Sequence, residues 1–358
     1  MKYAGIVLRN TKNALSSVEY EAVHDALLSG GVFLDELTFL AYDVPSEISA
    51  ALSRFSLECD GVFLVCDGVL LDFARSAVCA VTGGSFVNEY ILETKRCLYA
   101  VLPHGREGAD IVKKDLLARI NRRRNDSYSR MVYRCVSAPA ERLDNALALA
   151  RKAAQDMLFI HAAEKFGDVR IEVIYNQKTP KMIADEVVRI LASELEGYIY
   201  ALEDVSLAER LVTALKLHNL HVATAESFTG GGVGRAIVQV PGASAVFYEG
   251  VNAYDTKAKK ERLGVSDFTL KNKGAVSEEA AREMASGLIK QGNCELAIAT
   301  TGNAGPTASG KAPVGTCFIA IGTKERVRVF RFRLSGDRET VTETAVNLAL
   351  FLAYKEIK

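Results

Sequence analysis

The segment Gly61–Cys66, Gly-Val-Phe-Leu-Val-Cys, is an unbroken apolar run, and it constrains the fold more than any other stretch of the chain. A strand that is apolar at every position is typical of a parallel sheet that is covered by helices on both faces. The flanking sequence alternates predicted strands with predicted helices, at 3–8, 17–28, 33–42 and 45–55. We therefore predict a doubly wound α/β domain over residues 1–130.

Two further α/β regions follow. Residues 131–200 hold a predicted helix at 143–159, an alternating strand at 169–175 and a helix at 182–195, which together predict a small connector module. Residues 201–358 open with Ser206 and Glu209, whose spacing is that of a capping box at the start of a helix. A length of 358 residues is enough for three domains of ordinary size.

Composition excludes several classes of function. The chain has 44 Lys and Arg against 44 Asp and Glu, so it lacks the basic footprint of a nucleic-acid-binding protein. We find no apolar run of the roughly 18 residues that a membrane span needs, and no signal-peptide core, so we expect a cytoplasmic protein without membrane contacts. The 7 cysteines and 5 histidines show no metal-ligand spacing, which predicts buried thiols and no metal site.

The most highly charged stretch is Arg119–Arg130, with Arg122, Arg123 and Arg124 at its centre. No aromatic or basic cluster extends it, as a nucleic-acid patch would require. We therefore predict a solvated linker there.

Glycine is concentrated in the last region, where 14 of the 27 glycines lie between positions 225 and 315. The first glycine loop, Ala225–Arg235, follows a predicted strand and precedes a predicted helix. That geometry points free backbone N–H groups and a helix N-terminus at an anion. A glycine turn kept for packing alone is the alternative.

A second feature of this region is a set of nucleophile and base candidates. Ser244, Tyr254 and Lys259 lie within 16 positions, and a lysine kept neutral by burial can deprotonate a serine. Taken alone, their spacing favours a turn serine and surface lysines, because Ser, Tyr and Lys are common residues. The loop that follows the predicted strand 296–299, Thr300–Pro306, offers hydroxyls and N–H donors suited to an oxyanion hole or ligand clamp.

Seven short motifs together resemble the CinA C-terminal domain, in the family's order and over most of residues 206–358. They are Ala225-Glu226-Ser227-x-Thr229-Gly230-Gly231, Pro241-Gly242-x-Ser244-Ala245, Tyr254 with Ala258-Lys259, Gly274-Ala275-Val276-Ser277, Thr301-Gly302-x-Ala304-Gly305-Pro306, Pro313-Val314-Gly315-Thr316 and Gly336-Asp337-Arg338. The family's activity is deamidation of nicotinamide mononucleotide to nicotinic acid mononucleotide and ammonia. The resemblance therefore implies an amidohydrolase.

The resemblance also implies roles for individual residues. Ser244 matches the nucleophile, and Tyr254 and Lys259 match the residues that activate it. Thr301 and Gly302 match the loop that holds the amide or its oxyanion. The implied substrate-binding residues are Ser227, Thr229, Gly230 and Gly231, which match the nucleotide loop, and Arg338. The family further implies a nucleotide substrate, a homodimer, and chemistry without a metal or cofactor.

The sequence departs from the family at several positions. Phe228 replaces a usual cysteine, and Thr342 stands where a second arginine is common. Residues 1–130 resemble the family's molybdopterin-binding-like domain, but Cys66–Phe73 lacks its glycine-rich, acidic nucleotide signature, and Leu8–Thr11 lacks an early Gly-Asp-Glu element. Two alternatives stay open: a non-catalytic nucleotide-binding or regulatory protein, and residual ADP-ribose pyrophosphatase activity in residues 1–130.

Overall fold

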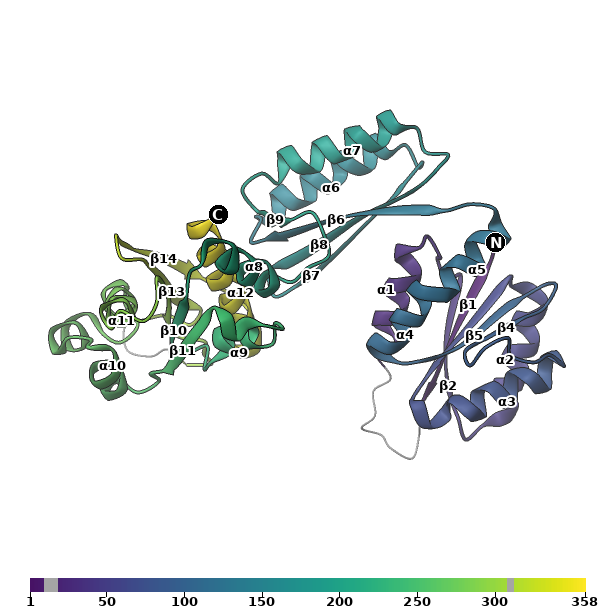
Figure 1. Cartoon of the computed structure of the whole chain (residues 1–358), viewed down its shortest axis with the longest axis horizontal. Helices are drawn as coiled ribbons and strands as arrows, with labels where there is room; N and C mark the ends of the chain where they lie inside the picture. The colour runs from purple at the N-terminus through teal and green to yellow at the C-terminus, as the bar shows by residue number, and fades with distance from the viewer. Residues whose placement is uncertain (10–18, 308–311) are drawn as a thin grey trace. The chain divides into compact units, whose positions relative to one another are not determined.

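The computed structural model describes residues 1–9, 19–307 and 312–358, so Asn10 and Thr11 of the expected Gly-Asp-Glu position lie outside it. The described residues form three sheets of five, four and five strands, each packed with helices, which confirms the predicted α/β class (Figure 1). The chain divides into two compact units: residues 1–131, 151–160 and 172–187, and residues 132–150, 161–171 and 188–358. Within the described residues, every helix is too short or too polar to cross a bilayer.

The N-terminal sheet has the doubly wound arrangement that the sequence predicts. Its strands are β1 (Tyr3–Arg9), β2 (Glu36–Ala41), β3 (Gly61–Cys66), β4 (Ile91–Glu93) and β5 (Leu98–Pro103), in the order β2-β1-β3-β5-β4. All pairs are parallel except β4 with β5. One face packs against α1 (Glu21–Ser29), α4 (Gly105–Ile111) and α5 (Leu117–Arg124), and the other against α2 (Pro45–Glu58) and α3 (Leu71–Thr82). All six residues of β3 are buried, as its apolar run predicts.

The prediction of a solvated linker over Arg119–Arg130 is wrong. Helix α5 continues to Arg124, and β6 (Tyr128–Val136) begins four residues later. The Arg124 guanidinium stacks on the Tyr128 ring at 4.3 Å and donates to the carbonyls of Gly30 and Gly31 at 2.6 and 2.9 Å. Because the guanidinium stacks on a ring and uses its N–H donors on two backbone carbonyls, this arginine is part of the packed domain.

The middle sheet contains three strands that the sequence analysis missed, β6, β7 (Phe159–Lys165) and β9 (Ile199–Ala201). With β8 (Asp168–Asn176) they form the order β7-β8-β6-β9, and α6 (Ala140–Ala154) and α7 (Lys181–Glu194) cover one face (Figure 1). The helix predicted over 143–159 ends at Ala154. Gln155 and Asp156 then adopt left-handed φ values of 49° and 58°, which turn the chain into β7.

The C-terminal sheet is mixed. Its strands are β10 (Val222–Glu226), β11 (Phe247–Asn252), β12 (Leu296–Gly302), β13 (Thr316–Gly322) and β14 (Val327–Arg333), in the order β11-β10-β12-β13-β14. Helices α8 (Leu207–His218), α9 (Gly232–Val238) and α12 (Arg338–Ile357) pack on one face, and α10 (Thr256–Leu263) and α11 (Glu278–Lys290) on the other. The predicted capping box is present, because Ser206 and Glu209 exchange hydrogen bonds of 2.7 and 3.2 Å.

The three parallel strands β11, β10 and β12 end at one edge of this sheet. Glu226, the last residue of β10, pairs with Asn252 on one side and Thr300 on the other. The loops that follow these strands therefore converge, as ligand-binding loops do at the carboxyl edge of parallel sheets.

Candidate active site

A buried lysine meets a serine at this edge of the sheet. Lys259 lies in α10 with 1% of its surface exposed, and its Nζ is 2.8 Å from Ser227 Oγ. Two carbonyl oxygens also contact Nζ, that of Ala253 at 2.7 Å and that of Tyr254 at 3.1 Å. Burial lowers the pKa of Lys259 to about 8, against the opposing effect of the Asp255 carboxylate.

The three oxygen contacts of Lys259 fit either protonation state, because the ammonium can donate to all three oxygens and the neutral amine can donate to two of them and accept from the Ser227 hydroxyl. A neutral amine has two N–H donors and one lone pair, whereas the ammonium has three donors. The two carbonyls can only accept, so they take the two N–H groups. The lone pair then faces the Ser227 hydroxyl, which can donate its proton. When Lys259 is neutral, the arrangement can therefore serve as a nucleophile and its base.

The loop that carries Ser227 is held by the carboxylate of Glu226, which is 1% exposed. Glu226 accepts hydrogen bonds from the Thr229 hydroxyl at 2.8 Å and from the backbone N–H groups of Gly231, Val233 and Gly234 at 3.1, 3.1 and 2.8 Å. These donors include the α9 N-terminus that the sequence pattern assigned to an anion. The protein's own carboxylate fills that position, so Thr229 and Gly231 serve the loop instead of a phosphate.

Further hydrogen bonds fix this loop to β12. The Thr229 and Thr300 hydroxyl oxygens are 2.6 Å apart, and the Ser227 N–H donates to the Thr300 carbonyl at 3.1 Å. Gly230 and Gly231 have φ values of 58° and 95°, which glycine adopts without strain. Among the described residues, no acceptor faces the N–H groups of Phe228 and Thr229. These donors follow Ser227 directly in the chain.

Ser244, the predicted nucleophile, lies elsewhere. It belongs to the short helix η3 (Ala243–Ala245), which precedes β11 and is therefore at the amino edge of the sheet. Strand β11 has 6 residues and so separates Ser244 from the carboxyl edge by roughly 20 Å. Ser244 is not positioned to act with Lys259.

Tyr254 and Arg338 come together as a pair. The Tyr254 side chain is 66% exposed, and its hydroxyl accepts a hydrogen bond from the Arg338 guanidinium at 3.2 Å. Arg338, the first residue of α12, also donates to the Gly305 carbonyl at 2.7 Å. Tyr254 therefore contacts Lys259 through its carbonyl oxygen, while its hydroxyl contacts Arg338.

Thr301 and Gly302 have structural contacts of their own. The Thr301 hydroxyl donates to the Ala275 carbonyl at 2.7 Å. A Cβ on Gly302 would lie 2.7 Å from the Cys317 Cβ and 2.9 Å from the Phe228 ring, so only glycine fits there. Phe228 is buried against Cys317 in a small apolar cluster, which accounts for the aromatic side chain at this position.

The sequence analysis did not assign a role to Glu226, Thr300 or the Ala253 carbonyl. Glu226 could have been found, because a glutamate directly before a serine and a glycine loop lies where its carboxylate can cap the next helix. The Ala253 carbonyl had no signal, since any residue supplies one.

Thiol and metal chemistry find little support in the described residues. All seven cysteines are free and six are buried; burial raises the pKa of Cys66 and of Cys317 to about 12. A thiol with so high a pKa is protonated at neutral pH and is a poor nucleophile. Over the described residues, no three His, Cys, Asp or Glu side chains come together as metal ligands would.

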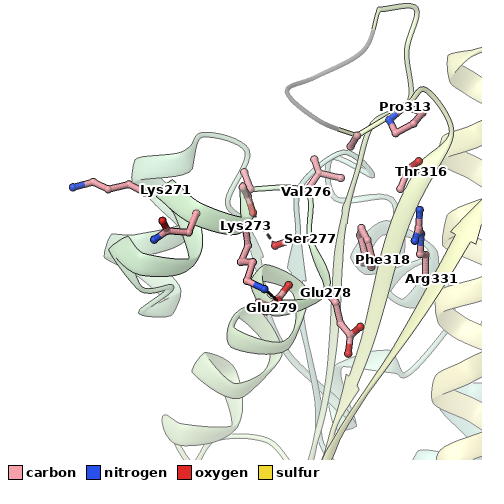
Figure 2. A pocket seen from close by; sticks show the side chains of 14 residues that line it. Lys271, Lys273, Val276, Ser277, Glu278, Glu279, Pro313, Thr316, Phe318 and Arg331 are labelled. Carbon is pink, nitrogen blue, oxygen red and sulfur yellow. Dashed lines mark hydrogen bonds and ion pairs between the residues drawn. The ribbon is translucent and has the colours of Figure 1, made fainter.

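A cavity of about 420 Å³ lies beside this site (Figure 2). Neither Ser227 nor Lys259 lines it. Its wall includes Ala275, whose carbonyl accepts the hydrogen bond from Thr301, and residues of β13, β14 and the start of α11. Thr301 is next to Thr300 in β12, and Thr300 accepts a hydrogen bond from the Ser227 N–H. The cavity wall and the Ser227 loop are therefore both hydrogen-bonded to the end of β12.

Comparison with known proteins identifies the family of this domain. Residues 204–357 match the sequence model of the CinA C-terminal domain. The chain belongs to the CinA family. A CinA-like protein of Kosmotoga olearia is 37% identical over 200 residues, covering 55% of this chain and 48% of that protein. A CinA-like protein of Chloroherpeton thalassium is 40% identical over 172 residues, covering 46% of this chain and 41% of that protein.

A crystal structure of a CinA superfamily protein from Klebsiella pneumoniae is 32% identical, covers 42% of this chain and 95% of that chain, and has a TM-score of 0.41. The chain spans about half the length of the curated relatives it matches. The match to the family model lies entirely within the predicted third region.

Proposed function

We propose that the C-terminal domain is an amidohydrolase that converts nicotinamide mononucleotide to nicotinic acid mononucleotide and ammonia. The observation that carries the proposal is the 2.8 Å contact between Ser227 Oγ and a Lys259 Nζ that is buried and held partly neutral at physiological pH. CinA family membership supports the choice of substrate. Ser227 replaces Ser244 as the nucleophile of the proposal.

In the first half-reaction, Lys259 takes the Ser227 proton and Oγ bonds to the carboxamide carbon. The tetrahedral intermediate collapses as its C–N bond breaks, and the proton on Lys259 passes to the departing nitrogen, which leaves as ammonia. In the second half-reaction, Lys259 deprotonates a water that attacks the acyl-serine ester. The carboxylic acid is released and Ser227 recovers its proton. These steps require no metal or cofactor.

The oxyanion in each tetrahedral intermediate needs hydrogen-bond donors. The N–H groups of Phe228 and Thr229 fit this role, because they directly follow the nucleophile and have no acceptor among the described residues. They replace the Thr301 hydroxyl in the proposal, since that hydroxyl donates to Ala275. Tyr254 and Arg338 are proposed to contact the substrate at the exposed side of the pair.

The test is to incubate the full chain with nicotinamide mononucleotide and to assay ammonia. We expect the wild type to release it and Ser227→Ala to lose at least about 1,000-fold in kcat/KM, as nucleophile removal does in serine hydrolases. Ser244→Ala is the matched control and should retain activity. Loss of activity in Ser244→Ala with retention in Ser227→Ala would reverse the assignment.

The non-catalytic alternative gives a different result in the same assay. A binding or regulatory protein would bind the mononucleotide in a calorimetric titration and release no ammonia. The Ser227–Lys259 contact favours catalysis, because burying a lysine beside a serine costs stability that ligand binding alone does not require.

A further inference from the structure

Thr300 is a fully buried threonine of β12 that contacts the Ser227 loop at two points. Its carbonyl oxygen accepts the Ser227 N–H at 3.1 Å, and its hydroxyl oxygen is 2.6 Å from that of Thr229. Pairing with Glu226 across β10 and β12 sets its place in the sheet. The two contacts lie on either side of Phe228, so one residue of β12 holds both ends of the segment that follows the nucleophile.

The direction of the hydroxyl contact follows from Glu226. The carboxylate can only accept, so the Thr229 hydroxyl uses its single proton on Glu226 Oε2 at 2.8 Å. Thr229 Oγ1 is then the acceptor in its contact with Thr300, whose hydroxyl donates. A chain of hydrogen bonds therefore runs from Thr300 through Thr229 to Glu226.

The donors proposed for the oxyanion lie between the two contacts. The N–H groups of Phe228 and Thr229 have no acceptor among the described residues. The turn that contains them is closed by the Gly230 N–H, which donates to the Ser227 carbonyl at 3.0 Å. Fixing this turn at residues 227 and 229 fixes the direction of both N–H groups and the place of Ser227 Oγ. Stabilisation of an oxyanion depends on donors that are held in place before the reaction.

We propose that Thr300 is a positioning residue of the reaction, because its hydroxyl and carbonyl hold the Ser227 turn in the geometry that binds the tetrahedral intermediate. The inference rests on the proposed function for the nucleophile and the oxyanion donors. Thr300 has no exposed surface with which to contact a substrate, so it acts through Thr229 and Ser227.

Thr300→Val replaces the hydroxyl with a methyl group and removes the hydrogen bond to Thr229. A methyl group needs about 3.5 Å from Thr229 Oγ1, against 2.6 Å for the native contact, so the turn has to move by roughly 1 Å. We expect kcat for nicotinamide mononucleotide to fall about 100-fold, as a misplacement of that size does. KM should stay within about twofold of the wild type, because no contact with the substrate is lost. Thr300→Ser restores the donor and should recover kcat to within about fivefold.

Thr224→Val is the matched control. Thr224 is a fully buried threonine of the neighbouring strand β10, and its hydroxyl has no hydrogen-bond partner within residues 1–9, 19–307 and 312–358. Its removal breaks no hydrogen bond, so kcat and KM should both stay within about twofold of the wild type. An equal loss of kcat in Thr224→Val, or no recovery in Thr300→Ser, would overturn the proposal, because the effect would then be a general disturbance of the core.

Labelling of the full chain with an alkyl fluorophosphonate separates this proposal from the proposed function. In that reaction Ser227 Oγ bonds to phosphorus and displaces fluoride, Lys259 takes the serine proton, and the phosphonyl oxygen uses the oxyanion donors. The labelling rate, followed by mass spectrometry, therefore depends on the same geometry but not on the nucleotide. We expect Thr300→Val to be labelled at least about tenfold more slowly than the wild type, and Thr300→Ser at nearly the wild-type rate.

The two assays give distinct outcomes. If the wild type is labelled at Ser227 but releases no ammonia, and the two Thr300 variants are labelled as expected, the positioning role stands and the deamidase proposal fails. If Thr300→Val is labelled at the wild-type rate and keeps any wild-type kcat, the positioning role is overturned, and ammonia release by the wild type still decides the deamidase proposal. A wild type that is neither labelled at Ser227 nor active would overturn both, because Ser227 would then not be an activated nucleophile.

Discussion

The N-terminal and C-terminal sheets are built alike but differ in what they bury. Each has five strands, including a block of parallel strands, with helices on both faces. Twelve polar or charged side chains are buried in the described residues, and none belongs to residues 1–131. Eleven belong to the C-terminal domain: Thr224, Glu226, Ser227, Thr229, Lys259, Thr269, Ser277, Thr300, Thr301, Asn303 and Thr316.

The difference is sharpest where the two sheets end. After β3, Asp67 caps a one-turn helix by accepting a hydrogen bond from Val69 at 3.2 Å, and the chain passes directly into α3. After β10, Glu226 organises a glycine loop that presents Ser227 to Lys259. A buried polar group costs stability unless it is hydrogen-bonded, and the many hydrogen bonds at this edge are where we propose the active site. The shared architecture does not reveal which domain has a site.

The largest effect is expected from removing the lysine that distinguishes the C-terminal edge. Lys259→Met keeps the length and burial of the side chain but has no basic nitrogen. We expect kcat/KM for deamidation to fall at least about 1,000-fold, because Ser227 loses the proposed base that contacts its hydroxyl at 2.8 Å. Lys257→Met, on the exposed face of the same helix, is the control. Similar activity in both variants would contradict the assignment of Lys259.

A smaller effect is expected from Glu226→Ala, which leaves three backbone N–H groups and a hydroxyl without their acceptor. We expect local opening of the loop to become easier by about 3 kcal/mol, the cost of several unsatisfied donors. Amide hydrogen exchange at Gly231, Val233 and Gly234 should accelerate by roughly 100-fold. The control is Glu261→Ala, which removes a carboxylate from an exposed ion pair and should leave the exchange of these amides as in the wild type. If Glu226→Ala also exchanges at the wild-type rate, Glu226 does not hold the loop.

The smallest effect is expected at the N-terminal edge. Asp67→Ala combined with Asp72→Ala removes two carboxylates from the position of the family's nucleotide signature. Deamidation should stay within about twofold of wild type, because neither carboxylate belongs to the C-terminal domain that carries the proposed site. A loss greater than about tenfold would show that the N-terminal domain contributes to the reaction, and would break the contrast between the two sheets.

Local chemistry was predictable from the sequence, and long-range pairing was not. The strand Gly61–Cys66, the Ser206–Glu209 capping box and a helix end at Asn219, which adopts a φ of 52°, each follow from adjacent residues. The serine that meets Lys259 is 32 positions away, whereas Ser244 is nearer in the chain. Ser244 is nearer to Lys259 in the sequence but not in space, because β11 carries the chain from one edge of the sheet to the other.

The central claim is that Lys259 acts on Ser227 as a neutral base, and the pH dependence of kcat/KM tests it most directly. Lys259 has a pKa of about 8 and is active only when deprotonated. The account therefore predicts that kcat/KM for nicotinamide mononucleotide rises about tenfold per pH unit below pH 8 and levels off above it. A profile that is flat from pH 6 to pH 9, or that falls as the pH rises through 8, would contradict it.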